Sequence, residues 1–400
     1  MKTLTLAWTY LWSRPLAAAL NLLLLSLGLA SISFLLLVSH QLDKAFERDL
    51  QGIDLVVGAK GSPMQLILSG VFHIDVPPGN VPLKAVLELE KHPLVAQVIP
   101  LSLGDSFQGF RIVGSSHDYI THYRAQLAQG QLWTQPMQVV LGAISARKLG
   151  MNVGQTFVGS HGLSAGGHAH GENFYTVVGI LAPSGSVLDR LILTDSASVW
   201  QVHQEHGPVT DDELSHVNER REVTMALLRY KTPLAALSLP RYVNGNTGMQ
   251  AAAPALEITR LLSMLGLGTD VLRAFAAVLL LTAGLSVFIA LWSAVRERRG
   301  DLALLRMLGA PPIKLAALLL LEALWLGLLA AALGLLAGQG MATALGWLLR
   351  LDNSLFVGGM VWPSELWLVP AMALGVSTLA ALLPALGAYR ISVLELLQGR

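Results

Sequence analysis

The stretch PLAAALNLLLLSLGLASISFLLLVS, residues 15–39, decides the fold, because it contains no charged side chain between Arg14 and His40. A bilayer core about 30 Å thick is crossed by a helix of roughly 20 predominantly apolar residues. The run is far longer than the apolar core of a cleaved signal peptide, which spans roughly 7–15 residues. The sequence therefore predicts a retained membrane-spanning helix at this position.

Three further stretches have the same character: residues 274–292, 315–349 and 366–389. Hydrophobic residues make up 53% of the 400-residue chain and charged residues only 13%, about half the share in an average globular protein. The composition excludes an ordinary soluble enzyme. A net charge of +1 gives no basic field for nucleic acid, and the absence of cysteine excludes disulfides and thiolate metal sites.

The distribution of cations orients the chain in the membrane. Five of them lie between the second and third apolar stretches, against two acids, and further cations lie near both termini. By the positive-inside rule, both termini and this link face the cytoplasm, and residues 41–268 lie outside. In a bacterium with two membranes, the chain is then a multi-pass protein of the inner (cytoplasmic) membrane with a large periplasmic domain.

The expected fold class is a membrane protein with four transmembrane α-helices in a 1+3 arrangement and a large α+β periplasmic domain inserted between the first and second. Residues 1–14 carry Trp8, Tyr10 and Trp12, which favour the membrane interface; this segment is either an interfacial helix or the first turns of the spanning helix. The remaining expected segments are the spans 15–40, 270–293, 315–349 and 366–389, the periplasmic domain 41–268, the cytoplasmic coupling segment 294–314, the short periplasmic link 350–365 and the cytoplasmic tail 390–400.

Residues 41–268 have a soluble-like composition and a mixed pattern of elements. DLVVGA at 54–59 and RLILTD at 190–195 are typical of strands, and LKAVLELEKHP at 83–93 has helical spacing. A helix over 232–243 should end at Pro240, because proline lacks a backbone N–H. Residues 251–273 predict a helix that continues toward the second span. No phosphate-binding loop and no H-E-x-x-H motif occurs, so we expect no catalytic residues in this chain.

The order of these segments resembles the MacB/FtsX/LolE-type permeases, the mechanotransmission (type VII) family of ABC transporters. RERRGDLALLRMLGAPPIKL at 296–315 looks like the cytoplasmic stretch that precedes the family's third span. ARKLGMNVGQTFVG at 146–159, followed by YTVVGIL at 175–181, is similar to its periplasmic pattern. LLPALGAYRISVLELLQGR at 382–400 resembles its usual ending. The resemblance covers the chain end to end, with Asp301 where the family commonly has Glu.

The resemblance implies a permease that is not itself an enzyme. A separate ABC ATPase subunit, present as a dimer, binds ATP and contacts the cytoplasmic face, while two permease chains, expected as a homodimer, reshape the periplasmic domains. A short cytoplasmic helix ended by Gly309 and Pro311-Pro312 could transmit that motion. The alternative is that its cations only obey the orientation rule. The expected coupling residues are Arg296, Arg298, Arg299, Asp301 and Arg306.

Histidine is concentrated in the external part of the chain, and its densest group is SHGLSAGGHAHGENF at 160–174. Imidazole and carboxylate groups bind zinc, and glycine lets a loop wrap around an ion. The candidate ligands are His161, His168, His170 and Glu172. Because histidine-rich tracts are compositional evidence only, a solvated surface loop is the alternative interpretation.

Two functions therefore remain open at this point. The first is the permease subunit of an ATP-driven transporter, linked to zinc handling or to lipoprotein or peptide export. The second is a membrane scaffold that regulates a periplasmic partner such as a cell-wall hydrolase, as in the FtsX branch. Neither the cargo nor a periplasmic or outer-membrane partner can be deduced from the residues. Beyond these proteins, the expected partner is the lipid bilayer.

Overall fold

The computed structural model describes residues 3–13, 15–161, 169–203, 221–351 and 361–390. The chain divides into two compact units, which are described separately: a membrane unit of residues 1–43 and 264–400, and an external unit of residues 44–263. Two helices, α2 (Pro15–Leu50) and α10 (Pro254–Glu297), run without interruption across the boundaries between the units.

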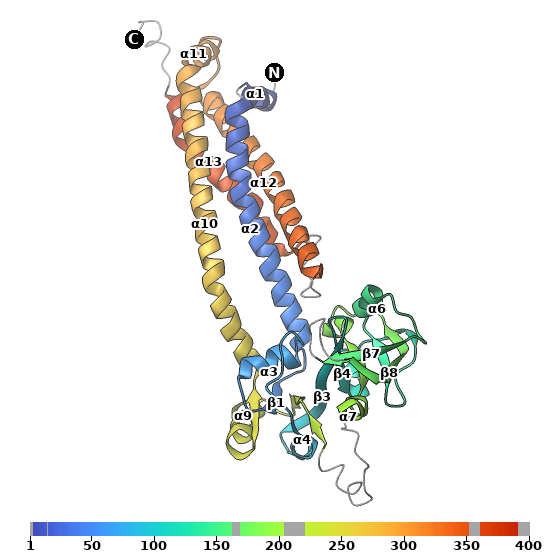
Figure 1. Ribbon diagram of the computed structural model, residues 1–400. Coiled ribbons are helices and arrows are strands. Elements are labelled where there is room, and N and C mark those ends of the chain that lie inside the picture. Colours follow the sequence, from blue (N-terminus) through green and yellow to red (C-terminus); the bar gives the residue numbers. More distant parts are fainter. Residues whose placement is uncertain (1–2, 14, 162–168, 204–220, 352–360, 391–400) are drawn as a thin grey trace, which may run out of the picture. The chain divides into compact units, whose positions relative to one another are not determined.

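Helices form all of the described membrane unit (Figure 1). Four of its helices are long and apolar enough to cross a bilayer. The expected fold class is confirmed, because a mixed α/β unit lies between the first and second of these helices. Besides α2 and α10, the helices of this unit are α1 (Thr3–Leu11), α11 (Arg299–Met307), α12 (Pro312–Leu351), the 3₁₀ turn η2 (Ser364–Trp367) and α13 (Leu368–Tyr389).

Small residues bring the membrane helices close together. A Cβ atom built on Gly334 of α12 would lie 2.6 Å from Cβ of Leu29, and one built on Gly338 would lie 2.6 Å from Oγ of Ser33. Gly334 and Gly338 form a G-x-x-x-G motif, which lets two helix backbones approach closely in lipid. The motif therefore places α12 directly against α2.

A ten-stranded sheet organises the external unit, with the path β12-β1-β11-β3-β4-β9-β6-β8-β5, and β7 pairs with both β3 and β8. Most pairs are antiparallel; β4 with β9 and β6 with β8 are parallel. The strands are β1 (Leu55–Ala59), β3 (Val95–Phe107), β4 (Phe110–Ser115), β5 (Leu127–Gly130), β6 (Gln138–Leu141), β7 (Thr156–His161), β8 (Ala169–Leu181), β9 (Ile192–Asp195), β11 (Met225–Tyr230) and β12 (Met249–Ala252), and β2 (Val81–Pro82) pairs separately with β10 (Glu222–Val223).

One half of this sheet closes on itself. Because β7 joins β8 back to β3, the six strands β3, β4, β9, β6, β8 and β7 form a ring. Its core contains large apolar side chains, among them Phe110, Phe157 and Tyr175. Phe157 and Tyr175 stack with ring centroids 5.5 Å apart. A barrel this small is filled by side chains and is not a pore.

The other half of the sheet is covered on both faces. Along β1, Val56 packs in one core cluster, whereas Leu55 and Val57 pack in another, because successive side chains of a strand point to opposite faces. Helix α3 contributes to the first cluster and helices α4 and α9 to the second. The remaining elements of this unit are α3 (Pro63–Gly70), α4 (Leu83–Glu90), α5 (His117–His122), α6 (Ala143–Leu149), η1 (Val187–Arg190), α7 (Ser196–His203) and α9 (Ala235–Asn246).

One local expectation is wrong. Helix α9 does not end at Pro240 but continues to Asn246 with the proline inside it. The proline is only the sixth residue of the helix, and its missing N–H costs one backbone hydrogen bond. The apolar face formed by Ala235, Leu239 and Val243 is fully buried against the sheet. Burial of this face outweighs the loss of that bond.

Candidate functional site

The segment that links the second and third spans contains the end of α10 and the short helix α11. Helix α10 includes Arg296, and helix α11 begins at Arg299, after Arg298 has adopted a non-helical conformation. Gly309, with φ of +90°, follows α11 and lets the chain turn before α12 begins at Pro312. The segment is therefore a short helix set between two long ones.

Arg298 belongs to a contact within the membrane unit. Its guanidinium lies 4.6 Å from the centroid of the Tyr10 ring and donates hydrogen bonds to the backbone carbonyl of Tyr10 and to Oγ of Ser13. Cation–π attraction and these bonds together hold the end of α1 against the start of α11. Helix α1 is separate from α2, and its Trp8 packs edge-on against Trp325 of α12 with centroids 5.1 Å apart. Arg298 is thus already engaged by the chain's own residues.

The other expected coupling residues are distributed along the same segment. Arg296 and Asp301 are exposed, and Arg306 is half-buried. Arg299 is placed at the start of α11, but its side chain lies outside the described set. The structure therefore places Arg296, Asp301 and Arg306 within one short segment, at the end of α10 and along α11.

The charge pattern did not indicate the most unusual feature of α11, which is an exposed apolar stripe. Leu304, Met307 and Leu308 are 58%, 59% and 85% exposed, and their spacing of three and four residues puts them on one face. On another side of the helix, Leu302 is buried in the core of the membrane unit. The sequence did contain an indication of this stripe. Its leucines fall on two faces of the helix, and only one of these faces can pack against the core.

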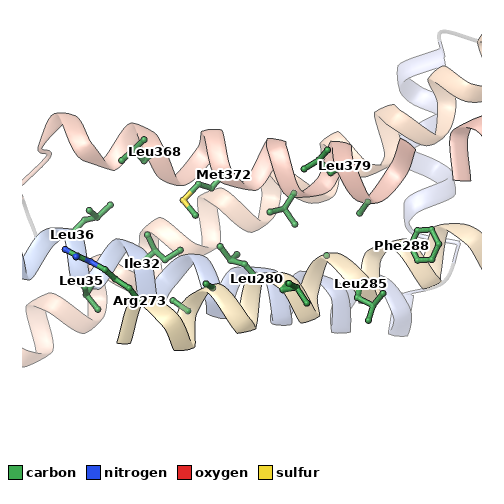
Figure 2. A pocket seen from close by; sticks show the side chains of 16 residues that line it. Ile32, Leu35, Leu36, Arg273, Leu280, Leu285, Phe288, Leu368, Met372 and Leu379 are labelled. Carbon is green, nitrogen blue, oxygen red and sulfur yellow. The ribbon is translucent and has the colours of Figure 1, made fainter. Parts of the chain in front are cut away.

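An apolar groove of about 770 Å³ lies between α2, α10 and α13. Figure 2 shows the side chains of Leu368, Met372 and Leu379 on α13 facing those of Ile32 and Leu280 across it. Arg273 lies at one end and is the one charged side chain among the described residues that line the groove. It is exposed and forms an ion pair with Asp270 at 3.1 Å. The groove can accept a hydrocarbon chain with a polar group near Arg273.

The expected metal ligands lie only partly within the described chain. His161 ends strand β7, and His170 and Glu172 belong to β8, whereas His168 lies outside the described residues. Strand pairing places Asp105 of β3 opposite His161, and β7 and β8 form a hairpin. Across the described ranges, no three histidine, aspartate or glutamate residues are grouped to hold a metal ion. The zinc site therefore stays a prediction.

These features define a class of protein: a four-span membrane protein with a mixed α/β domain inserted after its first span. Two family models match the chain. The MacB-like periplasmic core domain matches residues 18–232, and the FtsX-like permease C-terminal domain matches residues 273–393. The chain belongs to the MacB/FtsX-like family of ABC transporter permeases.

Two solved structures show weak similarity to this chain. The periplasmic region of MacB from Actinobacillus actinomycetemcomitans is 14% identical; the match covers 54% of this chain and 95% of that one, with a TM-score of 0.35. The extracellular domain of the noncanonic ABC-type transporter YknZ from Gram-positive bacteria is 12% identical; that match covers 50% and 98% of the two chains, with a TM-score of 0.29. A comparison with curated proteins gives no match.

Proposed function

We propose that this chain is the permease subunit of an ATP-driven transporter of the mechanotransmission type and that α11 is the docking element for a separate ATPase subunit. The observation that carries the proposal is the exposed stripe of Leu304, Met307 and Leu308. Exposed apolar residues grouped on one face are typical of a protein–protein interface. Asp301 lies one turn before Leu304 and adds a polar contact at the rim.

The two uninterrupted helices supply a route for movement. Residues 254–263 of α10 belong to the external unit, and the rest of the helix belongs to the membrane unit and ends one residue before Arg298. Helix α2 crosses the boundary in the same way at residue 43. A displacement of α11 by ATP-driven closure of the partner would reach the external unit through the backbone hydrogen bonds of these helices.

The chain contains no cysteine, so its orientation can be tested by single-cysteine labelling. We expect that Leu237→Cys, at a 70% exposed position of α9, reacts with a membrane-impermeant maleimide on spheroplasts of a two-membrane bacterium. Met307→Cys should react only after the inner membrane is permeabilised. Labelling with the opposite pattern would contradict the proposal, because α11 would then face away from cytoplasmic ATP.

The docking surface is tested by purifying the full chain from its native membranes in mild detergent. We expect an ABC ATPase, identified by mass spectrometry, to co-purify together with ATP hydrolysis. The double substitution Leu304→Glu and Leu308→Glu should lower both by at least tenfold, because burial of two carboxylates in an apolar interface is costly. Leu237→Glu, at an equally exposed leucine of the external unit, is the matched control. Retention of the ATPase by the double variant would refute docking through α11.

The groove favours a cargo that carries an acyl chain, such as a lipoprotein. Ala277 lines the groove and is exposed, whereas Ala274 is exposed but does not line it. Ala277→Phe should reduce the acyl-linked molecules that co-purify with the chain, and Ala274→Phe should not. Equal recovery from both variants, measured by mass spectrometry, would exclude the groove as their binding site.

A role in zinc handling rests on the histidines of the β7–β8 hairpin. Titration of the full chain with zinc should show a site that is weakened when His168 and His170 are both changed to Ala. It should also weaken below pH 6.5, because the ligands must be neutral imidazoles. Heat of binding that is unchanged in this variant would remove the zinc proposal and leave the permease function intact.

A further inference from the structure

A second concave site lies wholly within the external unit. Its lining is polar and charged, whereas the lining of the groove is apolar. It is a polar pocket of about 380 Å³ in which residues far apart in the sequence meet. We call it the arginine pocket. Its lining residues are Arg48, Gln51, Gly52, Gln97, Thr121, His122, Tyr123, Arg124, Ser184, Ser186 and Arg229.

The pocket is strongly positive. Of the described residues that line it, three are arginines and none is an aspartate or a glutamate. Among the described residues, neither Arg124 nor Arg229 forms an ion pair, whereas Nε of Arg48 lies 4.0 Å from Oδ1 of Asp49. That carboxylate also accepts a hydrogen bond from the backbone N–H of Val187 at 3.0 Å. Two of the three guanidinium groups therefore form no ion pair with a carboxylate of the described part of the chain.

The surrounding backbone leaves room for these side chains. A Cβ atom on Gly185 would lie 3.1 Å from Nη1 of Arg48, and one on Gly52 would lie 3.0 Å from Cε1 of His122. Both glycines have positive φ, +70° and +78°, which side chains disfavour. Arg124 itself has φ of +52°, an uncommon conformation for a residue with a side chain. The chain adopts two tight turns and one unfavourable backbone conformation around this pocket.

Uncharged hydrogen-bonding groups complete the lining. Arg229 on β11 is paired in register with Gln97 on β3, so the two side chains lie on the same face of the sheet. Nε2 of His122 is buried and has no hydrogen-bond partner among the described residues. A buried nitrogen without a partner is costly unless a water or a ligand satisfies it.

We propose that the arginine pocket binds a small ligand through a phosphate group. Guanidinium groups bind phosphate and carboxylate oxygens through paired N–H donors. Three arginines without a lining carboxylate favour the more highly charged of these anions, because a phosphate monoester carries about −1.5 to −2 charges near neutral pH. The hydroxyl groups of Thr121, Ser184 and Ser186 also line the pocket. They are hydrogen-bonded within the chain, Thr121 to the carbonyl of His117 at 3.2 Å, Ser184 to Oδ1 of Asp189 at 2.8 Å and Ser186 to Ser184 at 2.7 Å, so the guanidinium groups carry the binding. The phosphate belongs either to a soluble ester or to a lipid headgroup.

The test uses the full chain in a neutral detergent and phosphate-free buffer, with glycerol 3-phosphate as the probe in a calorimetric titration at constant ionic strength. We expect saturable binding, and acetate should bind at least tenfold more weakly. Arg124→Gln and Arg229→Gln should each weaken binding at least tenfold, and Arg229→Lys by less. Arg241→Gln, an exposed arginine of α9 outside the pocket, should have no effect.

A second titration with dihexanoyl phosphatidic acid separates the two sources of phosphate. Tighter binding of this lipid than of glycerol 3-phosphate supports a headgroup, and equal binding supports a soluble ester. Three results would overturn the proposal: no saturable binding of either probe, equal binding of acetate, or an equal loss of affinity in the Arg241→Gln variant. Because Arg124 and Arg229 are exposed, both pocket variants should fold, and their thermal unfolding without ligand checks this.

Discussion

The two units of this chain are packed by different means, and the difference follows from their solvents. The external unit buries large side chains, including Tyr119, Tyr175 and Leu101, in three core clusters. The membrane unit brings helix backbones together at glycines such as Gly334 and Gly338. In water, removal of apolar surface stabilises the fold, whereas in lipid a leucine is equally well solvated outside the bundle. Helix association in the membrane therefore depends on close contact.

The apolar groove and the arginine pocket differ in polarity, as the solvents of their two units do. The described residues that line the groove of the membrane unit are apolar apart from Arg273 at its end, whereas the arginine pocket of the external unit presents three arginines and several hydroxyl groups. A charged cluster is tolerated in the external unit because water solvates it when no ligand is present. The membrane unit could hold such a cluster only at high cost. The two ligand chemistries that we propose, hydrocarbon and phosphate, therefore belong to separate units.

The largest expected effect tests the contrast in apolar burial. Leu101→Ala in β3 should destabilise the external unit by about 2–5 kcal/mol, because it removes buried surface and leaves a cavity. Leu25→Ala in α2 should cost about 2 kcal/mol less, since the three carbon atoms removed are as soluble in lipid as in the bundle. Denaturant unfolding of the full chain, resolved by hydrogen exchange into the two units, measures both. Equal costs would refute the distinction.

A matched pair of glycines in α12 tests the contrast in close contact. A Cβ atom on Gly338 would lie 2.6 Å from Cβ of Ser33 and 3.0 Å from the carbonyl oxygen of Ala30, whereas one on Gly340 meets nothing within 4 Å. Gly338→Ala should therefore destabilise the bundle by about 1–3 kcal/mol through overpacking. Gly340→Ala should stabilise it by roughly 0.5–1 kcal/mol, because alanine favours the helix. Thermal unfolding in detergent compares the two variants, and a neutral Gly338→Ala would show that α2 and α12 are not in close contact.

This pair also shows how far the sequence alone can predict the structure. Length and hydropathy predict the four spans, and Gly309 predicts where α11 ends. The sequence alone does not distinguish Gly338 from Gly340. Only the packing of α12 against α2 determines which of the two glycines has a close neighbour. Even so, the G-x-x-x-G spacing of Gly334 and Gly338 was a readable signal.

The candidate sites were predictable to different degrees. The coupling role of residues 294–314 stays a proposal, and the charge pattern of this segment did not indicate the exposed apolar stripe of Leu304, Met307 and Leu308. The role of Arg298 depends on Tyr10, which lies far away in the sequence and contacts it only after folding. The arginine pocket was not predictable, because the register between Arg229 and Gln97 and the turns at Arg124 and Gly52 bring its residues together.

The smallest expected effect is a pH dependence of stability that arises from a buried histidine of the external unit. Nε2 of His73 is hydrogen-bonded to the hydroxyl of Tyr119 at 2.9 Å, and the residue is only 6% exposed. Burial lowers the pKa of His73 well below its usual value, and the charges of Arg111 and Arg190 lower it further. The folded state therefore holds the neutral ring, while the unfolded chain gains a proton as the pH falls through about 6.5.

Stability of the external unit should accordingly be full above pH 6.5 and decline below it, by at most about 1.4 kcal/mol per pH unit for one such group. His122, whose pKa is lowered mainly by burial, adds a contribution of the same sign. His73→Asn keeps a residue that tolerates the local φ of +55° but removes the imidazole, so this decline should become shallower. Hydrogen exchange at pH 7.5 and 5.5, corrected for the intrinsic exchange rate, measures the difference in each unit. An unchanged slope in the variant would mean that His73 is not the group that gains the proton, and a slope confined to the membrane unit would contradict the assignment to the external core.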